Sequence, residues 1–225
     1  TDFDGDMDSV RATADDVEYL LKTTNHHFPN ACLKPEDVWS TWAGVRPLIR
    51  SDEESAGKTS REHQLFRDPR GITTVAGGKL TTYRSMAEEI VDAALDHLGP
   101  THGVTASKCT TGQVPLDPNL PAVTDPIEGP SDPTDYHLWR HFGSGGDWIR
   151  ARWISHPDER TQLVQELPYT LAEVSFAVIH EQAECLEDIF VRRLQIFFRA
   201  PDQGVGCAEA VVHHMAKLLG QTDEW

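Results

Sequence analysis

A run of donor-bearing residues between a predicted strand and a predicted helix is the part of the sequence best suited to chemistry. Two glycines, Gly77 and Gly78, are followed by Lys79, and hydroxyl and guanidinium groups come within the next turn. Glycine lets the main chain adopt positive φ angles and approach a ligand closely. A helix N-terminus adds unpaired N–H groups and a partial positive charge. Together these features predict a site for an anionic group.

The same run has a plainer interpretation, as a strand-to-helix turn that carries a surface lysine. The further donors in this turn favour a functional site, and they are Thr81, Thr82, Tyr83 and Arg84. We expect Arg84 itself to have a structural role. The run is not a P-loop, because Thr73 stands where that motif needs its first glycine. The Gly-x-Gly-x-x-Gly fingerprint of dinucleotide-binding folds occurs nowhere in the chain.

Two arginines add positive charge upstream of the glycine pair. Residues 38–48 predict a strand that stops at Pro47, because proline cannot donate to a further ladder position. Arg46 would then lie at a strand end, where sheets often present groups to ligands. Arg61 follows a polar loop. We predict that the cations converge as a pocket formed by Arg46, Arg61, Lys79 and Arg84. The alternative for Arg61 and Arg84 is that they are ordinary surface charges.

Hydrophobic periodicity and turn residues predict the elements that position these groups. Helices are predicted over 15–27 and over 85–98, the second stopped by Gly99 and Pro100, and strands over 63–67 and 72–76. Residues 100–134 are rich in proline, glycine and threonine, which indicates a linker. Thr170 and Glu173 have the spacing of a capping box. The helices predicted after the linker are 136–142, 147–155, 158–166, 170–183, 186–199 and 207–219.

The order and spacing of three motifs resemble FAD-dependent glycerol-3-phosphate dehydrogenase. These motifs are residues 41–48, 60–63 and 77–87, and the helical segments after residue 170 carry a weaker likeness. The resemblance extends over nearly the whole chain and concerns the C-terminal part of the family. Family members begin with a flavin-binding half that carries the glycine fingerprint missing here. We therefore interpret the chain as the C-terminal part of a longer flavoenzyme.

The resemblance implies an α+β remnant followed by an all-α domain. The first, residues 1–99, would be the C-terminal part of the FAD/substrate domain, which is D-amino-acid-oxidase-like and has antiparallel strands and helices. Residues 100–134 would be the linker, and residues 135–225 a helical-bundle cap domain. FAD is the implied cofactor, with its main binding site on the N-terminal part outside this chain.

The implied activity is oxidation of sn-glycerol 3-phosphate to dihydroxyacetone phosphate, with hydride transfer to the flavin and electrons passed to quinone. Arg46 and Lys79 would be catalytic, and Arg46, Arg61 and Lys79 would bind the substrate. The residues that would contact the cofactor are Gly77, Gly78, Lys79, Leu80 and Thr81. Two alternatives stay open: a glycerol-3-phosphate oxidase that uses oxygen, and a fragment that acts only as a helical interaction or dimerisation module.

Composition narrows the range of partners. A net charge of -16 argues against nucleic acid and anionic membrane surfaces. The four cysteines form no CxxC pair, so no metal site is predicted. No apolar run has the length of a membrane span. We expect a cytoplasmic protein that in full-length form is a homodimer and lies peripherally at the inner face of the cell membrane.

Limited proteolysis tests the predicted linker. We expect the first cut to fall between Gly99 and Asp135, because domain boundaries concentrate in proline- and glycine-rich connections. Mass spectrometry of the early fragments would locate the cut. First cleavage between residues 171 and 219 would contradict the domain boundaries.

Overall fold

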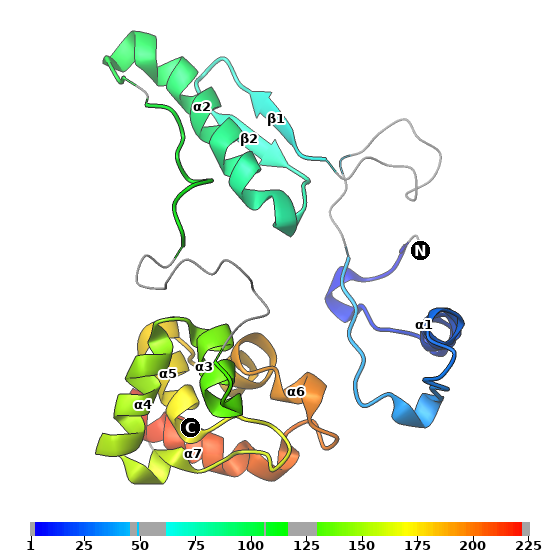
Figure 1. The fold of residues 1–225 in the computed structure, drawn as a ribbon. Helices are drawn as coiled ribbons and strands as arrows, with labels where there is room; N and C mark the ends of the chain where they lie inside the picture. Colours follow the sequence, from blue (N-terminus) through cyan, green and yellow to red (C-terminus); the bar gives the residue numbers. More distant parts are fainter. Residues whose placement is uncertain (1–2, 46–48, 50–61, 106, 117–129, 222–225) are drawn as a thin grey trace. The chain divides into compact units, whose positions relative to one another are not determined.

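Two compact units make up the structure, a computed structural model that describes residues 3–45, 49, 62–105, 107–116 and 130–221 (Figure 1). The first unit comprises Thr1–Val10 and Gly44–Pro118, and the second comprises Arg11–Ala43 and Asn119–Trp225. Described helices and a two-stranded antiparallel sheet account for the regular structure. Among the described residues, no helix combines the length and apolarity needed to cross a membrane.

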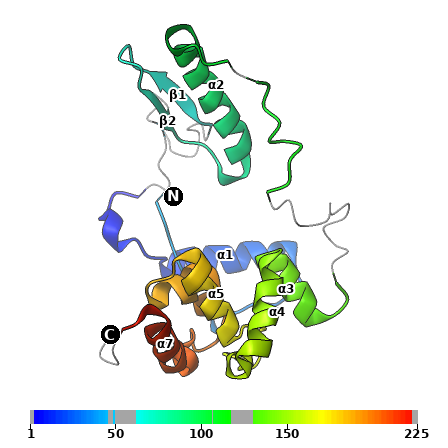
Figure 2. The same ribbon diagram turned by 90° about the vertical axis from the view of Figure 1, so that its left-hand side faces the viewer.

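A β-hairpin with a long helix along one face forms the centre of the first unit (Figures 1 and 2). Strand β1 (Gln64–Arg67) pairs antiparallel with β2 (Thr73–Ala76), and both lie where strands were predicted. Asp68 closes the turn between them, because its carboxylate accepts from both the main-chain N–H and the guanidinium of Arg70 at 2.8 Å. Helix α2 (Tyr83–His102) then returns along the hairpin.

Helix α2 is longer than the predicted 85–98. It continues through Gly99 and Pro100 and ends at Gly103, which has a φ of 63° and donates its N–H to the Gly99 carbonyl at 3.1 Å. The prediction of a stop at Gly99 was wrong because a proline in the last turn interrupts little of the helical hydrogen bonding. The left-handed glycine three residues later is what ends the helix.

In the N-terminal segments the predicted helix is confirmed and the predicted strand is wrong. Helix α1 (Ala14–His27) follows the short 3₁₀ turn η1 (Met7–Ser9) and begins with a capping box in which the Thr13 N–H donates to Asp16 at 2.9 Å. After a second 3₁₀ turn, η2 (Pro35–Asp37), residues 38–45 form no strand. An extended segment becomes a strand only when a neighbour pairs with it, and no described segment does so here. Residues 46–48 lie outside the described ranges.

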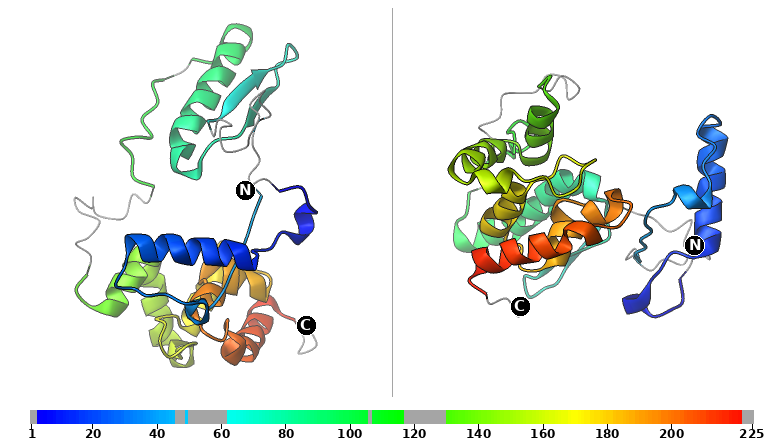
Figure 3. Two further views of the ribbon diagram at one scale, coloured as in Figure 1. Left: turned by 90° about the vertical axis from the view of Figure 1, so that its right-hand side faces the viewer. Right: turned by 90° about the horizontal axis from the view of Figure 1, so that it is seen from below.

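Helices that pack around two hydrophobic clusters form most of the second unit (Figure 3). Their bounds are α3 (Pro133–Phe142), α4 (Gly145–Ser155), α5 (Leu171–Glu181), α6 (Ile196–Arg199) and α7 (Val205–Leu219). Tyr169, Leu194, Val211 and Met215 are fully buried in the larger cluster, and Leu138 and Ile149 are fully buried in the smaller one. The capping box at the start of α5 is confirmed, since the Thr170 N–H donates to the Glu173 carboxylate at 2.8 Å.

Two predicted helices of this unit are wrong. Residues 158–166 give only the 3₁₀ turn η4 (Pro157–Arg160), because the Gln162 side chain binds the Gln165 and Leu167 carbonyls and Pro168 disfavours helix at the residue before it. Residues 186–199 divide into the π-helical turn η5 (Asp188–Arg193) and α6. Gln195, with a φ of 57°, separates the two.

A buried network of polar side chains joins α4, η4, α5 and α7. Arg152 donates to both carboxylate oxygens of Glu159, at 2.8 and 2.6 Å. Ser175 Oγ lies 2.7 Å from Glu159 Oε2 and 2.7 Å from His214 Nε2. Burial alone would raise the pKa of Glu159, but the hydrogen bonds from Arg152 and Ser175 bring it below its ordinary value. Because the ionised carboxylate only accepts, Ser175 donates to it and the His214 Nε2–H donates to Ser175.

This network predicts a pH dependence of stability. Burial lowers the pKa of His214, and Arg152 and Lys217 add to this effect against the opposing charges of Glu159 and Asp158. The unfolded chain therefore takes up the proton first as the pH falls below about 6.5, and the free energy of unfolding decreases until His214 also titrates in the folded state.

The test replaces His214 by glutamine, which can still donate to Ser175 but does not titrate. We expect His214→Gln to reduce the fall in thermal midpoint between about pH 7.5 and 5.5, relative to the unchanged chain. His213→Gln, which alters the exposed neighbour on the same helix, should keep the full dependence. An unaltered pH profile in His214→Gln would show that this histidine does not couple folding to pH.

Candidate functional site

The glycine pair lies directly after β2, as predicted, and both residues have positive φ angles, 72° for Gly77 and 99° for Gly78. A Cβ on Gly77 would lie 3.0 Å from the main-chain oxygen of Glu62. A Cβ on Gly78 would lie 2.5 Å from Met86 Cε and 3.2 Å from His63 Cβ. Glycine is therefore required here because the turn passes close to residues 62 and 63 of the same unit.

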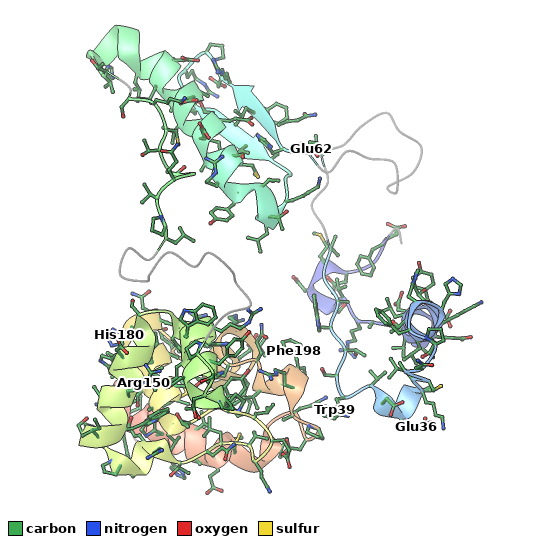
Figure 4. All side chains as sticks on the ribbon, viewed as in Figure 1. Glu36, Trp39, Glu62, Arg150, His180 and Phe198 are labelled. Carbon is green, nitrogen blue, oxygen red and sulfur yellow. The ribbon has the colours of Figure 1, made fainter. Side chains whose placement is uncertain are left out.

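Lys79 follows in an extended conformation and is held by a carboxylate. Its Nζ lies 3.0 Å from Glu62 Oε1, and the two side chains are 47% and 70% exposed. Glu62 itself lies just before β1 (Figure 4). The register of the hairpin explains the contact: Gln64 is opposite Ala76, so continuing the antiparallel pairing brings position 62 opposite position 78. Sequence reasoning missed Glu62, although it lies within the motif at 60–63 and the hairpin register could have indicated it.

The residues predicted to contact the cofactor lie together in one continuous turn. Gly77, Gly78 and Lys79 lead into the 3₁₀ turn η3 (Leu80–Thr82), and α2 begins immediately afterwards. Leu80, the residue after Lys79, is 86% exposed, so the turn presents an apolar side chain to solvent. An apolar side chain, a cation and a main chain without Cβ atoms suit the edge of a planar, partly anionic ring system. The five predicted residues are thus contiguous, and their contact with a cofactor stays a prediction.

Two further polar contacts fix the start of α2. His63 is largely buried, and its Nε2 lies 2.8 Å from Glu89 Oε2. Arg84 donates to Glu88 at 2.8 Å and to the Thr111 hydroxyl at 3.2 Å, and the hydrogen bond to Glu88 raises the pKa of Arg84. Arg84 thus ties the first turn of α2 to the segment beyond the helix, in keeping with the structural role expected for it.

The structure describes two members of the predicted cationic pocket, Lys79 and Arg84, and each is paired with a carboxylate, Glu62 and Glu88 respectively. Arg46 and Arg61 lie outside the described residues, so their convergence with Lys79 stays a prediction. Within the described ranges, no group of three or more histidine, cysteine or carboxylate side chains is arranged to hold a metal ion.

Comparison with known proteins relates this geometry to a family. Residues 109–225 match the family described as the C-terminal domain of alpha-glycerophosphate oxidase. Glycerol-3-phosphate dehydrogenase of Synechocystis sp. is 33% identical in an alignment of 234 residues that covers 99% of this chain and 41% of that protein. Aerobic glycerol-3-phosphate dehydrogenase of Staphylococcus haemolyticus is 40% identical in an alignment of 233 residues that covers 99% of this chain and 42% of that protein.

A solved structure extends the likeness to the fold. The crystal structure of glycerol-3-phosphate dehydrogenase from Bacillus halodurans, complexed with FAD, is similar at a TM-score of 0.67 and 26% identity. The match covers 99% of this chain and 44% of that chain.

The family match and the helices of the second unit define the class of protein, a helical C-terminal domain. The chain belongs to the family of the C-terminal domain of alpha-glycerophosphate oxidase. The resemblance inferred from the three motifs is thereby confirmed. The chain spans less than half the length of the relatives that it matches, since it covers 41% and 42% of the two curated proteins.

The glycine turn yields a prediction about local stability. Gly78→Ala should destabilise the hairpin, because a left-handed conformation costs a residue with a Cβ about 1–2 kcal/mol and the new methyl group would also meet Met86. Hydrogen exchange of the β1 and β2 amides should therefore become about 5- to 30-fold faster.

Gly103→Ala is the matched control. Gly103 also has a positive φ, 63°, but a Cβ there would have no atom within 4 Å. The control should leave exchange in β1 and β2 unchanged. Equal exchange in Gly78→Ala and the unchanged chain would mean that the turn tolerates a Cβ.

Proposed function

We propose that this chain is the C-terminal part of an FAD-dependent enzyme that oxidises sn-glycerol 3-phosphate to dihydroxyacetone phosphate. The observation that carries the proposal is a likeness along 99% of the chain to proteins named glycerol-3-phosphate dehydrogenase. The glycine turn with Lys79 supports it, because the substrate is a phosphate dianion and the reduced flavin gains negative charge. Both favour a cation nearby.

Exposed apolar faces support the idea that more protein belongs with this chain. Among its described residues the first unit has a two-stranded sheet, and Phe66 and Ile72 are 49% and 55% exposed. In the second unit no residue of α1 is buried, and Tyr19 and Leu20 are 69% and 60% exposed. An isolated two-stranded sheet is marginally stable in water, and apolar faces of this kind usually contact further protein. We assign that role to the N-terminal part of the proposed enzyme.

The roles of the turn residues follow from their positions. Bound FAD would supply the acceptor for the hydride that leaves the substrate. Gly77, Gly78, Leu80 and Thr81 would contact the edge of its ring system, and the Lys79 ammonium would stabilise negative charge there. The chain has no nucleotide fingerprint, so the main FAD site is proposed to lie in the N-terminal part.

The two arginines outside the described residues complete the proposal. Arg46 and Arg61 would bind the substrate phosphate, because a guanidinium presents paired donors that match phosphate oxygens. With the two arginines at the phosphate, Lys79 would lie near the oxygen of the developing carbonyl. Arg46 and Lys79 are the residues that we propose to be catalytic.

The family resemblance also suggests an electron acceptor, a domain arrangement, an oligomeric state and a location for the whole enzyme. Electrons would pass to quinone, and a glycerol-3-phosphate oxidase that uses oxygen is the second candidate. Residues 135–225 would form a cap domain joined by the linker 100–134 to the substrate domain at 1–99. The whole enzyme is proposed to be a homodimer, peripheral at the inner face of the cell membrane. Oxygen consumption measured against quinone reduction distinguishes the two acceptors.

Reconstitution tests the proposed function. The longer enzyme should purify with a flavin spectrum and reduce a dye when glycerol 3-phosphate is added. The isolated 225-residue chain should show neither property, because it lacks the nucleotide fingerprint. Failure of the longer enzyme to oxidise glycerol 3-phosphate would overturn the function, and a yellow isolated chain would overturn the assignment of the main FAD site.

Substitutions in the longer enzyme test the site. Arg46→Ala and Lys79→Ala should each lower turnover about a hundredfold or more, because a charge-assisted contact in a water-excluded site contributes about 2.7–4 kcal/mol. Arg46→Lys should recover only part of the activity, since a point charge cannot replace a two-pronged donor. Flavin content should stay near that of the unchanged enzyme.

His213→Ala is the control, because His213 is an exposed residue of α7 in the other unit. It should leave steady-state turnover unchanged. If Arg46→Ala left both kcat and the KM for glycerol 3-phosphate near those of the unchanged enzyme, the site assignment would be wrong.

A further inference from the structure

We propose that Glu62 is a positioning residue that holds the Lys79 ammonium at the glycine turn. This inference rests on the proposed function, in which Lys79 stabilises charge during the reaction. It adds a carboxylate to a site for which the sequence analysis predicted only positively charged side chains. The ion pair between Lys79 Nζ and Glu62 Oε1, at 3.0 Å, is the observation behind it.

The main chain brings the two residues together before their side chains interact. The carbonyl of Glu62 faces Gly77 so closely that a Cβ on Gly77 would lie 3.0 Å from it. Lys79 leaves the turn in an extended conformation, with φ and ψ of -123° and 142°. The backbones of residues 62 and 77–79 therefore form one local unit, and Glu62 keeps its place relative to Lys79 through the hairpin register.

A lysine side chain has many rotamers, and ordering it costs up to about 2 kcal/mol of conformational entropy. Nothing in the turn backbone fixes the ammonium, because Lys79 is 47% exposed and its neighbour Leu80 is 86% exposed. The Glu62 carboxylate restricts the rotamers to those that place Nζ beside the turn. A displacement of about 1 Å at a reacting centre can reduce the rate about a hundredfold, so this restriction matters for catalysis.

The same ion pair contributes little to folding. Pairs between exposed side chains typically contribute about 0.2–1 kcal/mol, and both members of this pair are exposed. Loss of Glu62 should therefore leave the fold intact. A functional effect of its removal would then reflect the position of Lys79.

The chain offers a matched control. Asp96 of α2 is also an exposed carboxylate paired with a cation of the hairpin, and its Oδ2 lies 3.6 Å from Arg67 Nη2. Asp96→Ala removes one carboxylate and one ion pair, as Glu62→Ala does, but leaves the contact at Lys79 in place. Glu62→Gln keeps an oxygen that accepts from Lys79 and removes only the charge.

The first experiment tests the position of Lys79 and needs no measurement of enzyme activity. Trace acetylation of the 225-residue chain with acetic anhydride, read by mass spectrometry, reports how accessible each lysine amine is. We expect Lys79 to react several-fold faster in Glu62→Ala than in the unchanged chain, relative to Lys108, and at the unchanged rate in Asp96→Ala. Equal labelling of Lys79 in Glu62→Ala and the unchanged chain would overturn the proposal.

The second experiment uses steady-state kinetics of the longer enzyme. Glu62→Ala should lower kcat about tenfold, with the KM for glycerol 3-phosphate within about twofold, because the lysine acts on charge that develops in the reaction. Glu62→Gln should restore most of kcat. Glu62→Ala combined with Lys79→Ala should be no slower than Lys79→Ala alone, since Glu62 acts through Lys79.

The possible failures are distinguishable. Absence of glycerol 3-phosphate oxidation by the unchanged enzyme would overturn the proposed function, and the labelling result would still decide whether Glu62 holds Lys79. If the enzyme is active and Lys79→Ala is slow, normal kcat in Glu62→Ala would overturn the positioning role. Additive losses in the double variant would also overturn it.

Discussion

The close passage of Gly77 and Gly78 past residues 62 and 63 is the constraint on which the candidate site depends. Without Cβ atoms the turn can adopt positive φ angles and lie against the Glu62 carbonyl and the His63 side chain. That approach brings Glu62 within hydrogen-bonding distance of Lys79 and exposes Leu80 beside it. The glycines thus serve the local packing and, in the proposed enzyme, also leave room for the cofactor.

The second unit depends on a different kind of constraint, a buried charge. Glu159 is 3% exposed and would be costly to bury without partners. Arg152 and Ser175 supply them, and His214 completes the chain of hydrogen bonds. Because these side chains come from three helices, the hydrogen-bond network is complete only when α4, α5 and α7 have docked. The network therefore couples the packing of the helices to one another.

Most elements that depend on residues close together in the sequence were predicted, whereas contacts between distant segments were not. Helix α1, the hairpin and the Thr170–Glu173 capping box depend on signals within a few residues, and they were predicted correctly. The helix over 158–166 was wrong for short-range reasons, since the Gln162 side chain binds carbonyls three and five residues away and Pro168 follows closely. The strand over 38–48 needs a pairing partner, which the local sequence does not identify. Glu62 was missed for the same reason: its contact with Lys79 depends on register across the hairpin, seventeen positions apart along the chain.

The charges of the proposed site suggest different roles for its lysine and its arginines. In a chain of net charge -16, the attraction of an anionic substrate must come from nearby cations, since exposed charges are largely screened beyond about 8 Å at physiological ionic strength. Lys79 shares its charge with Glu62, so its net pull on a distant phosphate is weak. Phosphate recognition is then left to guanidinium groups, which is the role proposed for Arg46 and Arg61. A lysine already held by a carboxylate is suited to charge that appears beside it during the reaction, because its position is established before that charge develops.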